Sequence, residues 1–249
     1  MFDSSRLVGT RNHPLDGLLT ATKGDEVARR PRGQLRQDIL DTVIELLIGT
    51  GDVDSVSIDA VVERVGCTPP ALYYYFPTKT DLLRQACEVE FRKLAEHIED
   101  GVAEVPGGSI LRLVRRGYAL LNWAGEHPAL YRVLFMGTGR TSLMGGVGLT
   151  DDPSLRAIAV DLEAAISEGL VKPADVRHLT LTLWGVVHGF ASLAVSFPLL
   201  PMPALEASLR LAMEAVGDRV LTDAGRRSWL EAERLRGGET ASLGQGARP

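Results

Sequence analysis

Side chains suited to contact nucleic acid gather in one stretch of the sequence, between residues 57 and 79. Hydroxyl groups and a lysine can bond to phosphates or base edges, and small apolar groups can pack on a thymine methyl group. The residues that carry these groups are Ser57, Thr68, Pro69, Pro70, Ala71, Tyr73, Tyr75 and Lys79. This composition predicts a site for double-stranded DNA, provided that local structure presents these residues on one surface.

Two short helices are predicted to present this site. Ser57 is an N-cap residue for a helix that ends at Gly66, because glycine tolerates the left-handed conformation after a helix. Thr68 caps a second helix, which begins with proline, where a missing N–H costs nothing. Residues 78–81 read as a capping box for a longer helix. Two short helices joined by a glycine turn have the dimensions of a helix-turn-helix, whose second helix enters the major groove.

The stretch "SIDAVVERVGCTPPALYYYFPTKTDLL" resembles the DNA-binding domain of the TetR family of bacterial regulators. The resemblance implies that residues 68–71 meet bases, that Tyr73 and Tyr75 approach bases or backbone, and that Lys79 contacts a phosphate. It also implies that three side chains pack inward: Leu72, Tyr74 and Phe76. The two prolines remove donors from the second helix, which favours readout through apolar contacts and DNA shape. Without the wider pattern, the tyrosines also fit ordinary core and surface aromatic residues.

The overall charge does not indicate a nucleic-acid-binding protein. The first 100 residues contain 12 Lys+Arg against 17 Asp+Glu and carry the whole net charge of −5, whereas the rest has 15 of each. Local positive charge remains at four arginines: Arg29, Arg30, Arg32 and Arg36. The first three form an arm near the minor groove or, alternatively, a solvated charge run.

The periodicity of the apolar residues predicts an all-α protein, with an N-terminal helix-turn-helix domain and a larger C-terminal helical bundle. The expected parts are a flexible arm over 1–30, a DNA-binding domain over 31–78, a ligand-binding and dimerisation domain over 79–225, and a disordered tail over 226–249. Helices are expected at about 32–48, 57–65, 69–75, 78–99, 108–126, 128–136, 153–169, 174–197 and 202–221. Proline is expected at the first position of three of them: Pro128, Pro153 and Pro173.

The C-terminal part is similar to the WHG type of TetR-family domain, through residues 184–189 and 127–135. Trp184 and His188 are four residues apart and therefore share a helix face. Together with aromatic and sulfur side chains of the two preceding helices, they predict an apolar cavity for a small molecule. The candidate ligand-binding residues are Trp123, Tyr131, Phe135, Met136, Trp184 and His188. Alternatively, these residues simply fill the core, and His188 fits a buried hydrogen-bonded histidine better than a metal ligand.

The segment from Leu179 to Leu205 contains no charged side chain. A single membrane span is one interpretation, and a helix buried in a core or subunit interface is the one we favour. With the next helix and their symmetry mates, it would form a four-helix bundle in a homodimer. The expected interface residues of the next helix are Leu205, Leu209, Ala212, Val216 and Val220. A two-fold dimer predicts a palindromic operator.

Several other classes fit the sequence poorly. Two cysteines make neither a disulfide scaffold nor a zinc site, and the N-terminus lacks a secretory signal, so we expect a cytoplasmic protein without a cofactor. The glycine clusters between residues 137 and 148 do not have the spacing of a P-loop, which argues against an enzyme. We expect a ligand-responsive regulator, most simply a repressor, released by a small, largely apolar effector. A helical dimerisation module without DNA binding is the alternative.

Overall fold

The computed structural model describes residues 33–103, 107–137 and 153–245, with side chains to residue 236. In these ranges every regular element is a helix, apart from one isolated bridge between Val171 and Leu221, which confirms the all-α prediction. The predicted flexible arm and most of the glycine-rich segment lie outside the described residues, as do the three arginines of the arm.

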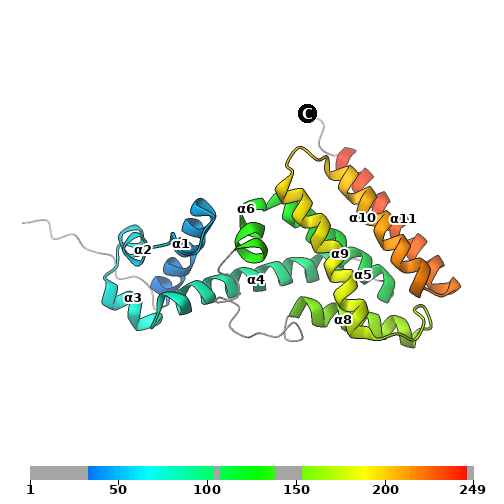
Figure 1. Ribbon diagram of the computed structural model, residues 1–249, viewed down its shortest axis with the longest axis horizontal. Helices are drawn as coiled ribbons and strands as arrows, with labels where there is room; N and C mark the ends of the chain where they lie inside the picture. Colours follow the sequence, from blue (N-terminus) through cyan, green and yellow to red (C-terminus); the bar gives the residue numbers. More distant parts are fainter. Residues whose placement is uncertain (1–32, 104–106, 138–152, 246–249) are drawn as a thin grey trace, which may run out of the picture.

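Three helices form a compact unit at the N-terminal end (Figure 1). They are α1 (Gln34–Thr50), α2 (Ile58–Val65) and α3 (Pro69–Tyr75). Their shared core consists of fully buried side chains, namely Ile39, Val43, Leu47, Val61, Leu72 and Phe76. These positions recur at three- and four-residue spacing, so each helix turns one apolar face toward the other two.

The long helix α4 (Lys79–Ala103) joins this unit to the rest of the chain (Figure 1). It begins at the predicted capping box, in which the Asp81 N–H donates to Thr78 Oγ1 at 3.0 Å and the Thr78 hydroxyl donates to the Asp81 carboxylate at 2.8 Å. Helix α4 packs against α1 and against α5. Any tilt of α4 relative to α5 would therefore move the N-terminal unit.

The C-terminal bundle is built around α5 (Ser109–Glu126), which contacts most of the other helices. The remaining elements are α6 (Pro128–Tyr131), the π-helical turn η1 (Arg132–Met136), α8 (Pro153–Ser167), α9 (Val176–Ser196) and α10 (Met202–Val220). Pro128 and Pro153 begin helices as expected. The expectation for Pro173 is wrong, because α9 starts after Asp175, whose carboxylate accepts from the N–H groups of Arg177 and His178.

A further helix, α11 (Asp223–Gln245), occupies most of the segment predicted as a disordered tail over 226–249. The helix was not predicted because this segment is mostly polar and charged. Part of it nevertheless packs on α5. Ala232 is buried, and the Arg236 guanidinium lies 3.7 Å from the ring centroid of Tyr118. Arg236 also pairs with Glu206 of α10 at 3.1 Å. The prediction of disorder is therefore wrong for residues 226–245.

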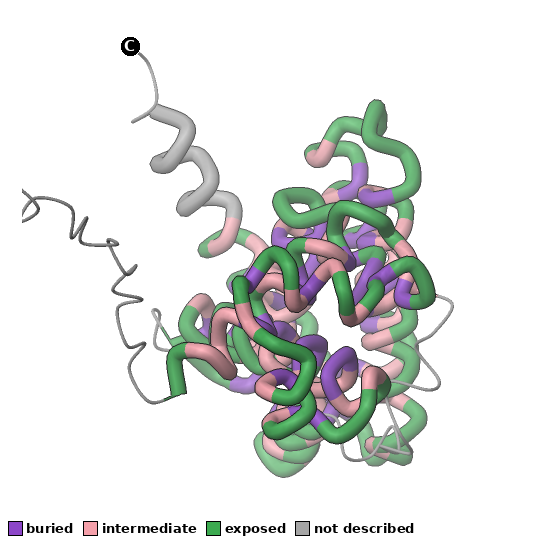
Figure 2. The backbone as a smooth tube through the Cα atoms, turned by 90° about the vertical axis from the view of Figure 1, so that its left-hand side faces the viewer, coloured by how far each residue is buried: buried purple, intermediate pink, exposed green. Residues whose placement is uncertain are grey.

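Buried segments gather where the helices face one another, and exposed segments occupy the outer turns (Figure 2). Helices α5 and α9 lie close together at Gly117, where an added Cβ would lie 3.3 Å from a methyl group of Val187. Glycine at this position allows the two helices to pack tightly along the side that bounds the cavity described below.

Candidate DNA-binding surface and ligand cavity

The turn between α2 and α3 has the geometry that the sequence predicts. The Ser57 hydroxyl accepts from the Ala60 N–H at 3.1 Å, which satisfies a free donor at the start of α2. Gly66 ends α2 with φ of 68°, and its N–H donates to the carbonyl groups of Val62 and Glu63. Ser57 is exposed but is already engaged as a cap, so its first role is to fix the start of α2.

Helix α3 presents its first turn to solvent. Thr68, Pro69 and Pro70 are exposed, and Ala71 is half-buried. Thr68 stands at the N-cap position, but its hydroxyl makes no capping hydrogen bond. The reason is local: both prolines lack an N–H, and the Ala71 N–H donates to the carbonyl oxygen of Thr68 at 3.0 Å. The hydroxyl of Thr68 is thus not needed to hold the helix.

The tyrosines of α3 differ from the expectation at one position. Leu72 and Phe76 are fully buried, as predicted, and Tyr73 is 46% exposed. Tyr74, which was expected to pack inward, is 82% exposed. Residue 74 lies two positions from each buried neighbour, which places it on the opposite side of the helix. Tyr75 is half-buried and meets the Tyr74 ring edge-on, with centroids 5.1 Å apart.

Two basic residues near this surface have partners within the protein. Lys79, at the start of α4, donates through Nζ to the carbonyl oxygen of Asp54 at 3.2 Å. Arg36 donates to Gln85 of α4 at 2.5 Å and lies over the ring of Phe76. Arg36 therefore ties α1 to α4, whereas Lys79 stays half-buried beside the turn that precedes α2.

A cavity of about 200 Å³ lies in the C-terminal bundle, with walls from α4, α5, α8, α9 and α10. Most of its wall is apolar. For comparison, an apolar cavity of about 150 Å³ in another protein holds benzene. The described part of the chain thus contains space for a small molecule.

Three of the six predicted ligand-binding residues line this cavity: Phe135, Trp184 and His188. The imidazole of His188 lies against both other rings in tilted arrangements, with centroid distances of 4.1 Å to Trp184 and 4.7 Å to Phe135. Tyr131 lies behind His188 and is fully buried, with its hydroxyl 2.8 Å from His188 Nδ1. Tyr131 does not line the cavity, and its hydroxyl group thus holds the imidazole from outside the cavity.

The other two predicted residues do not reach the cavity. Trp123 is buried and packs against His127, with ring centroids 5.3 Å apart. Met136 is 45% exposed at the end of η1. Sequence spacing placed both on the right helices, but neither faces the inner wall. They remain outside the group that the fold brings together.

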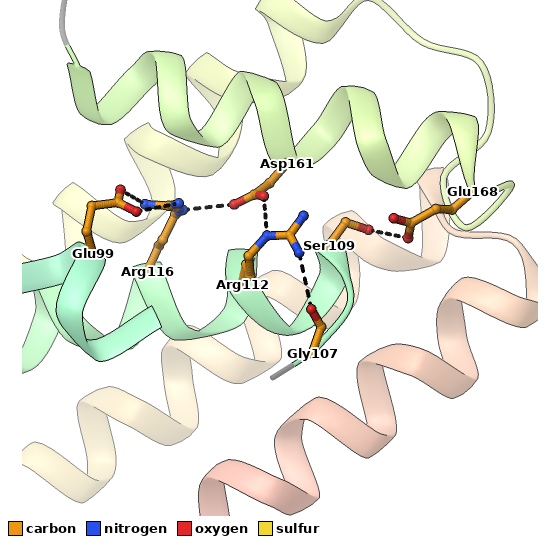
Figure 3. Close-up of polar contacts among 7 residues, drawn as sticks. All are labelled: Glu99, Gly107, Ser109, Arg112, Arg116, Asp161 and Glu168. Atoms are coloured by element: carbon orange, nitrogen blue, oxygen red, sulfur yellow. Dashed lines mark hydrogen bonds and ion pairs between the residues drawn. The ribbon is translucent and has the colours of Figure 1, made fainter. Parts of the chain in front are cut away.

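A charged cluster that the sequence did not predict joins α4, α5 and α8 (Figure 3), and two of its members, Glu99 and Arg116, line the same cavity. The buried carboxylate of Asp161 on α8 accepts from Arg112 Nε at 2.5 Å and from Arg116 Nε at 2.9 Å. Arg116 also forms a two-pronged ion pair with Glu99 of α4. Arg112 and Arg116 are four residues apart and therefore share one face of α5, and this spacing is the sequence feature that could have indicated the cluster.

Two further hydrogen bonds lie near the start of α5, beside this charged cluster. Arg112 also donates to the carbonyl oxygen of Gly107 at 3.1 Å, and the Ser109 hydroxyl donates to Glu168 at 2.7 Å (Figure 3). Burial acts to lower the pKa of Arg116, but hydrogen bonds to Glu99 and Asp161 outweigh it, and the pKa is raised. The Arg116 side chain, 11% exposed, therefore stays charged where it lines the cavity.

Helix α9 carries an apolar stripe on its outer side. Leu181, Gly185, Gly189, Leu193 and Phe197 recur at every fourth position and are all exposed. An added Cβ at either glycine would meet no atom within 4 Å, so the stripe is hollowed at its centre. Among the described residues, α9 is the one helix long and apolar enough to cross a membrane, with 22% of the relevant window buried. The core helix of a soluble protein can be equally long and apolar.

The expected interface residues of α10 need a correction. Leu205 and Leu209 are buried within the chain, because this side of α10 packs toward α9 and α5. Ala212, Val216 and Val220 are half-buried. The exposed large apolar residue of α10 is Leu211, at 67%. In the described ranges no group of three His, Cys, Asp or Glu side chains could hold a metal ion.

Comparison with known families matches both parts of the chain. Residues 39–86 match the family described as bacterial regulatory proteins of the tetR family. Residues 113–216 match the tetracyclin repressor-like C-terminal domain. The HTH-type transcriptional regulator EthR of Mycolicibacterium smegmatis is 26% identical over 114 residues, which are 45% of this chain and 52% of the relative. The chain thus matches about half the length of that curated relative.

Solved structures share the fold. A TetR transcription regulator from Haloarcula marismortui aligns with a TM-score of 0.62 and 22% identity, over 76% of this chain and 99% of its own. A gamma-butyrolactone receptor, described as ArpA-like, aligns with a TM-score of 0.50 and 20% identity, over 81% and 96%. With two family models matched in order along one chain, this protein belongs to the TetR family of bacterial transcriptional regulators.

Proposed function

We propose that this regulator binds a palindromic operator as a homodimer and is released by a small, largely apolar effector. The observation that carries the proposal is the arrangement along α4. At one end stands a helix-turn-helix with an exposed recognition helix, and at the other a cavity in whose wall α4 takes part. The same helix thus contacts both functional parts of the chain.

The DNA contacts are assigned to α3 and the start of α4. A helix enters the major groove, about 12 Å wide, only with a slim leading end, and residues 68–71 supply one. The exposed hydroxyl groups of Tyr73 and Tyr74 suit phosphate contacts, and Tyr75 lies beside them. Lys79 reaches a phosphate by exchanging its bond to the Asp54 carbonyl for a charge-assisted one. Ser57 supports the site by capping α2, and from this position it contacts the sugar-phosphate backbone of the DNA.

The dimer interface is assigned to the outer stripe of α9, together with Leu211 of α10. A soluble monomer rarely leaves so long an apolar surface exposed. The hollow at Gly185 and Gly189 allows the partner's helix to approach closely, and the flanking leucines would close around it. Two α9–α10 pairs then form a four-helix bundle. This arrangement explains the apolar character of α9 without a membrane and agrees with a cytoplasmic regulator.

Effector binding acts through α4. A ligand in the cavity shifts the population toward the α4 orientation that leaves more room, and in that orientation the two recognition helices no longer match half-sites about 34 Å apart. The printed name of one fold relative, a gamma-butyrolactone receptor, describes a protein of this shape that receives a small molecule. Repression relieved by ligand is the outcome we propose here.

The decisive experiment is a gel shift with the full chain and DNA from upstream of its own gene, at several salt concentrations. We expect binding to a palindrome that weakens steeply with salt. Tyr73→Ala should abolish binding while leaving the dimer intact, and Ile48→Ala, on the exposed end of α1, serves as a matched control. Retained palindrome binding by Tyr73→Ala would overturn the assignment of α3.

A further inference from the structure

We infer that the cavity selects uncharged ligands, and that the ion pair between Glu99 and Arg116 acts as its charge filter. This inference rests on the proposed function of the cavity as the effector site. It goes further by naming the ligand class, an apolar molecule without a carboxylate or ammonium group. The groups that carry it are the four charged side chains on the α4–α5–α8 side: Glu99, Arg112, Arg116 and Asp161.

The four charged side chains balance one another. Two guanidinium groups face two carboxylates, and every one of the four groups is hydrogen-bonded to an opposite charge. Arg116, the cation in the cavity wall, uses Nε for Asp161 and both terminal nitrogens for Glu99. Among the described residues of the wall, an anionic ligand therefore finds no unbalanced cation, and a cationic ligand finds no unbalanced carboxylate.

A charged ligand loses its hydration when it enters the cavity. The rest of the wall is mostly apolar, so a charged group that enters leaves water without gaining a full counter-charge. Moving an unpaired ion into such surroundings is strongly unfavourable, whereas an uncharged apolar molecule gains free energy there. The cavity thus disfavours both signs of charge, and it favours the uncharged member of any series of equal length.

The two carboxylates differ in how easily they can be neutralised to change this preference for uncharged ligands. Asp161 is deeply buried, with 4% of its side chain exposed, and it holds α5 to α8. Glu99 is 52% exposed and is bonded only to Arg116 in the described structure. Neutralising Glu99 therefore frees one edge of Arg116 and adds a net positive charge to the wall with little effect on packing.

The test uses the full-length protein and three probes of equal chain length, n-octanol, octanoate and octylammonium. Affinity is measured by calorimetry and by ligand-induced shifts of the unfolding temperature. We expect n-octanol to bind at least about tenfold more tightly than either charged probe. Glu99→Gln should tighten octanoate binding about tenfold and leave n-octanol unchanged. Glu96→Gln, one turn earlier on α4, exposed and outside the cavity wall, should behave like the natural chain.

Three outcomes would overturn the inference. These are octanoate or octylammonium binding as tightly as n-octanol, no gain of octanoate affinity in a folded Glu99→Gln protein, and no binding of any probe. Unfolding temperature and far-UV circular dichroism report whether the variant is folded, and Glu99→Ala provides a second variant with the same expected gain. Operator binding without probe is measured separately, so failure of the charge filter is distinguishable from failure of the proposed regulator function.

Discussion

The hydroxyl oxygen of Tyr131 lies 2.8 Å from Nδ1 of His188, and this contact joins the short helix after α5 to the middle of α9. The same hydroxyl lies 3.4 Å from Ser192 Oγ and 3.3 Å from the backbone carbonyl of His188. A fully buried phenol therefore sets the orientation of the imidazole that lines the cavity. It also fixes which ring nitrogen is turned away from the cavity wall.

Removing this hydroxyl should weaken the fold while preserving the packing of the ring. We expect Tyr131→Phe to lower the free energy of unfolding by about 1–2 kcal/mol, because the buried His188 loses a hydrogen-bond partner. Urea unfolding followed by tryptophan fluorescence measures the change. Tyr74→Phe removes the same group from an exposed ring and should change stability by less than about 0.5 kcal/mol. Equal effects of the two substitutions would contradict the role given to Tyr131.

The buried carboxylate of Asp161 should be more important for stability than any surface ion pair. Asp161→Asn leaves Arg112 without its carboxylate and Arg116 with Glu99 alone, and we expect a loss of about 3–5 kcal/mol. The control is Arg84→Gln, which breaks a partly exposed pair with Glu88 on α4 and should cost less than about 1 kcal/mol. Denaturant midpoints measured at equal protein concentration compare them. A small effect of Asp161→Asn would mean that the charged cluster does not hold α5 to α8.

The outer stripe of α9 predicts a specific failure of assembly. A carboxylate placed in a dry helical interface has no partner, so Leu193→Glu should convert the dimer to a monomer. Light scattering coupled to size exclusion measures the mass directly. Ile48→Glu introduces the same charge at an equally exposed aliphatic residue of α1 and should leave the mass unchanged. A dimeric Leu193→Glu protein would place the interface elsewhere.

Lys79 predicts a change in salt dependence rather than in sequence preference. Lys79→Gln should weaken operator binding and reduce the slope of log K against log salt concentration by about one per subunit, since one phosphate contact is lost. Lys93→Gln, on an exposed turn of α4, removes the same charge away from the recognition helix. Fluorescence anisotropy over a range of salt concentrations gives both slopes. An unchanged slope for Lys79→Gln would remove this residue from the DNA contacts.

The two cysteines should differ in reactivity. Burial first, and then the carboxylates of Glu90 and Glu88, raise the pKa of the Cys87 thiol to about 11, whereas Cys67 is half-buried in the turn between α2 and α3. At pH 8 the thiolate fraction of Cys87 is about 0.1%, so a disulfide reagent should modify Cys67 first and Cys87 only on unfolding. The folded Cys67→Ser protein should not react rapidly with the disulfide reagent. A rapid reaction would contradict the burial of Cys87.

The same pKa shift also sets a pH dependence. Between the ordinary pKa of 9.0 and about 11, the folded chain keeps a proton on Cys87 that the unfolded chain releases. This group therefore lowers the free energy of unfolding as pH rises through that window, and it has no effect below it. Cys87→Ala should flatten this part of the stability curve. If the free energy of unfolding of Cys87→Ala fell just as steeply between pH 9 and 11, groups other than Cys87 would cause the pH dependence.

The helix-turn-helix could be predicted from the sequence because its determinants are local. Ser57, Gly66 and the capping box at residues 78–81 each fix a helix end through bonds to neighbours within four residues. Apolar periodicity then decides which sides face inward. The error at Tyr74 came from a resemblance, whereas the spacing from Leu72 to Phe76 alone places residue 74 on the exposed side.

The cavity and α11 were decided by tertiary structure. Trp123, Phe135 and Met136 are all apolar or aromatic in sequence, but in the folded chain only Phe135 of these three meets His188 of α9 and lines the cavity. Arg112 and Arg116 become a charged cluster only when α8 brings Asp161 between them. Helix α11 lacks a continuous apolar side, and contacts with α5 and α10 decide its structure. Sequence thus determines helix ends and inner sides, whereas the filling of the space between helices depends on partners distant along the chain.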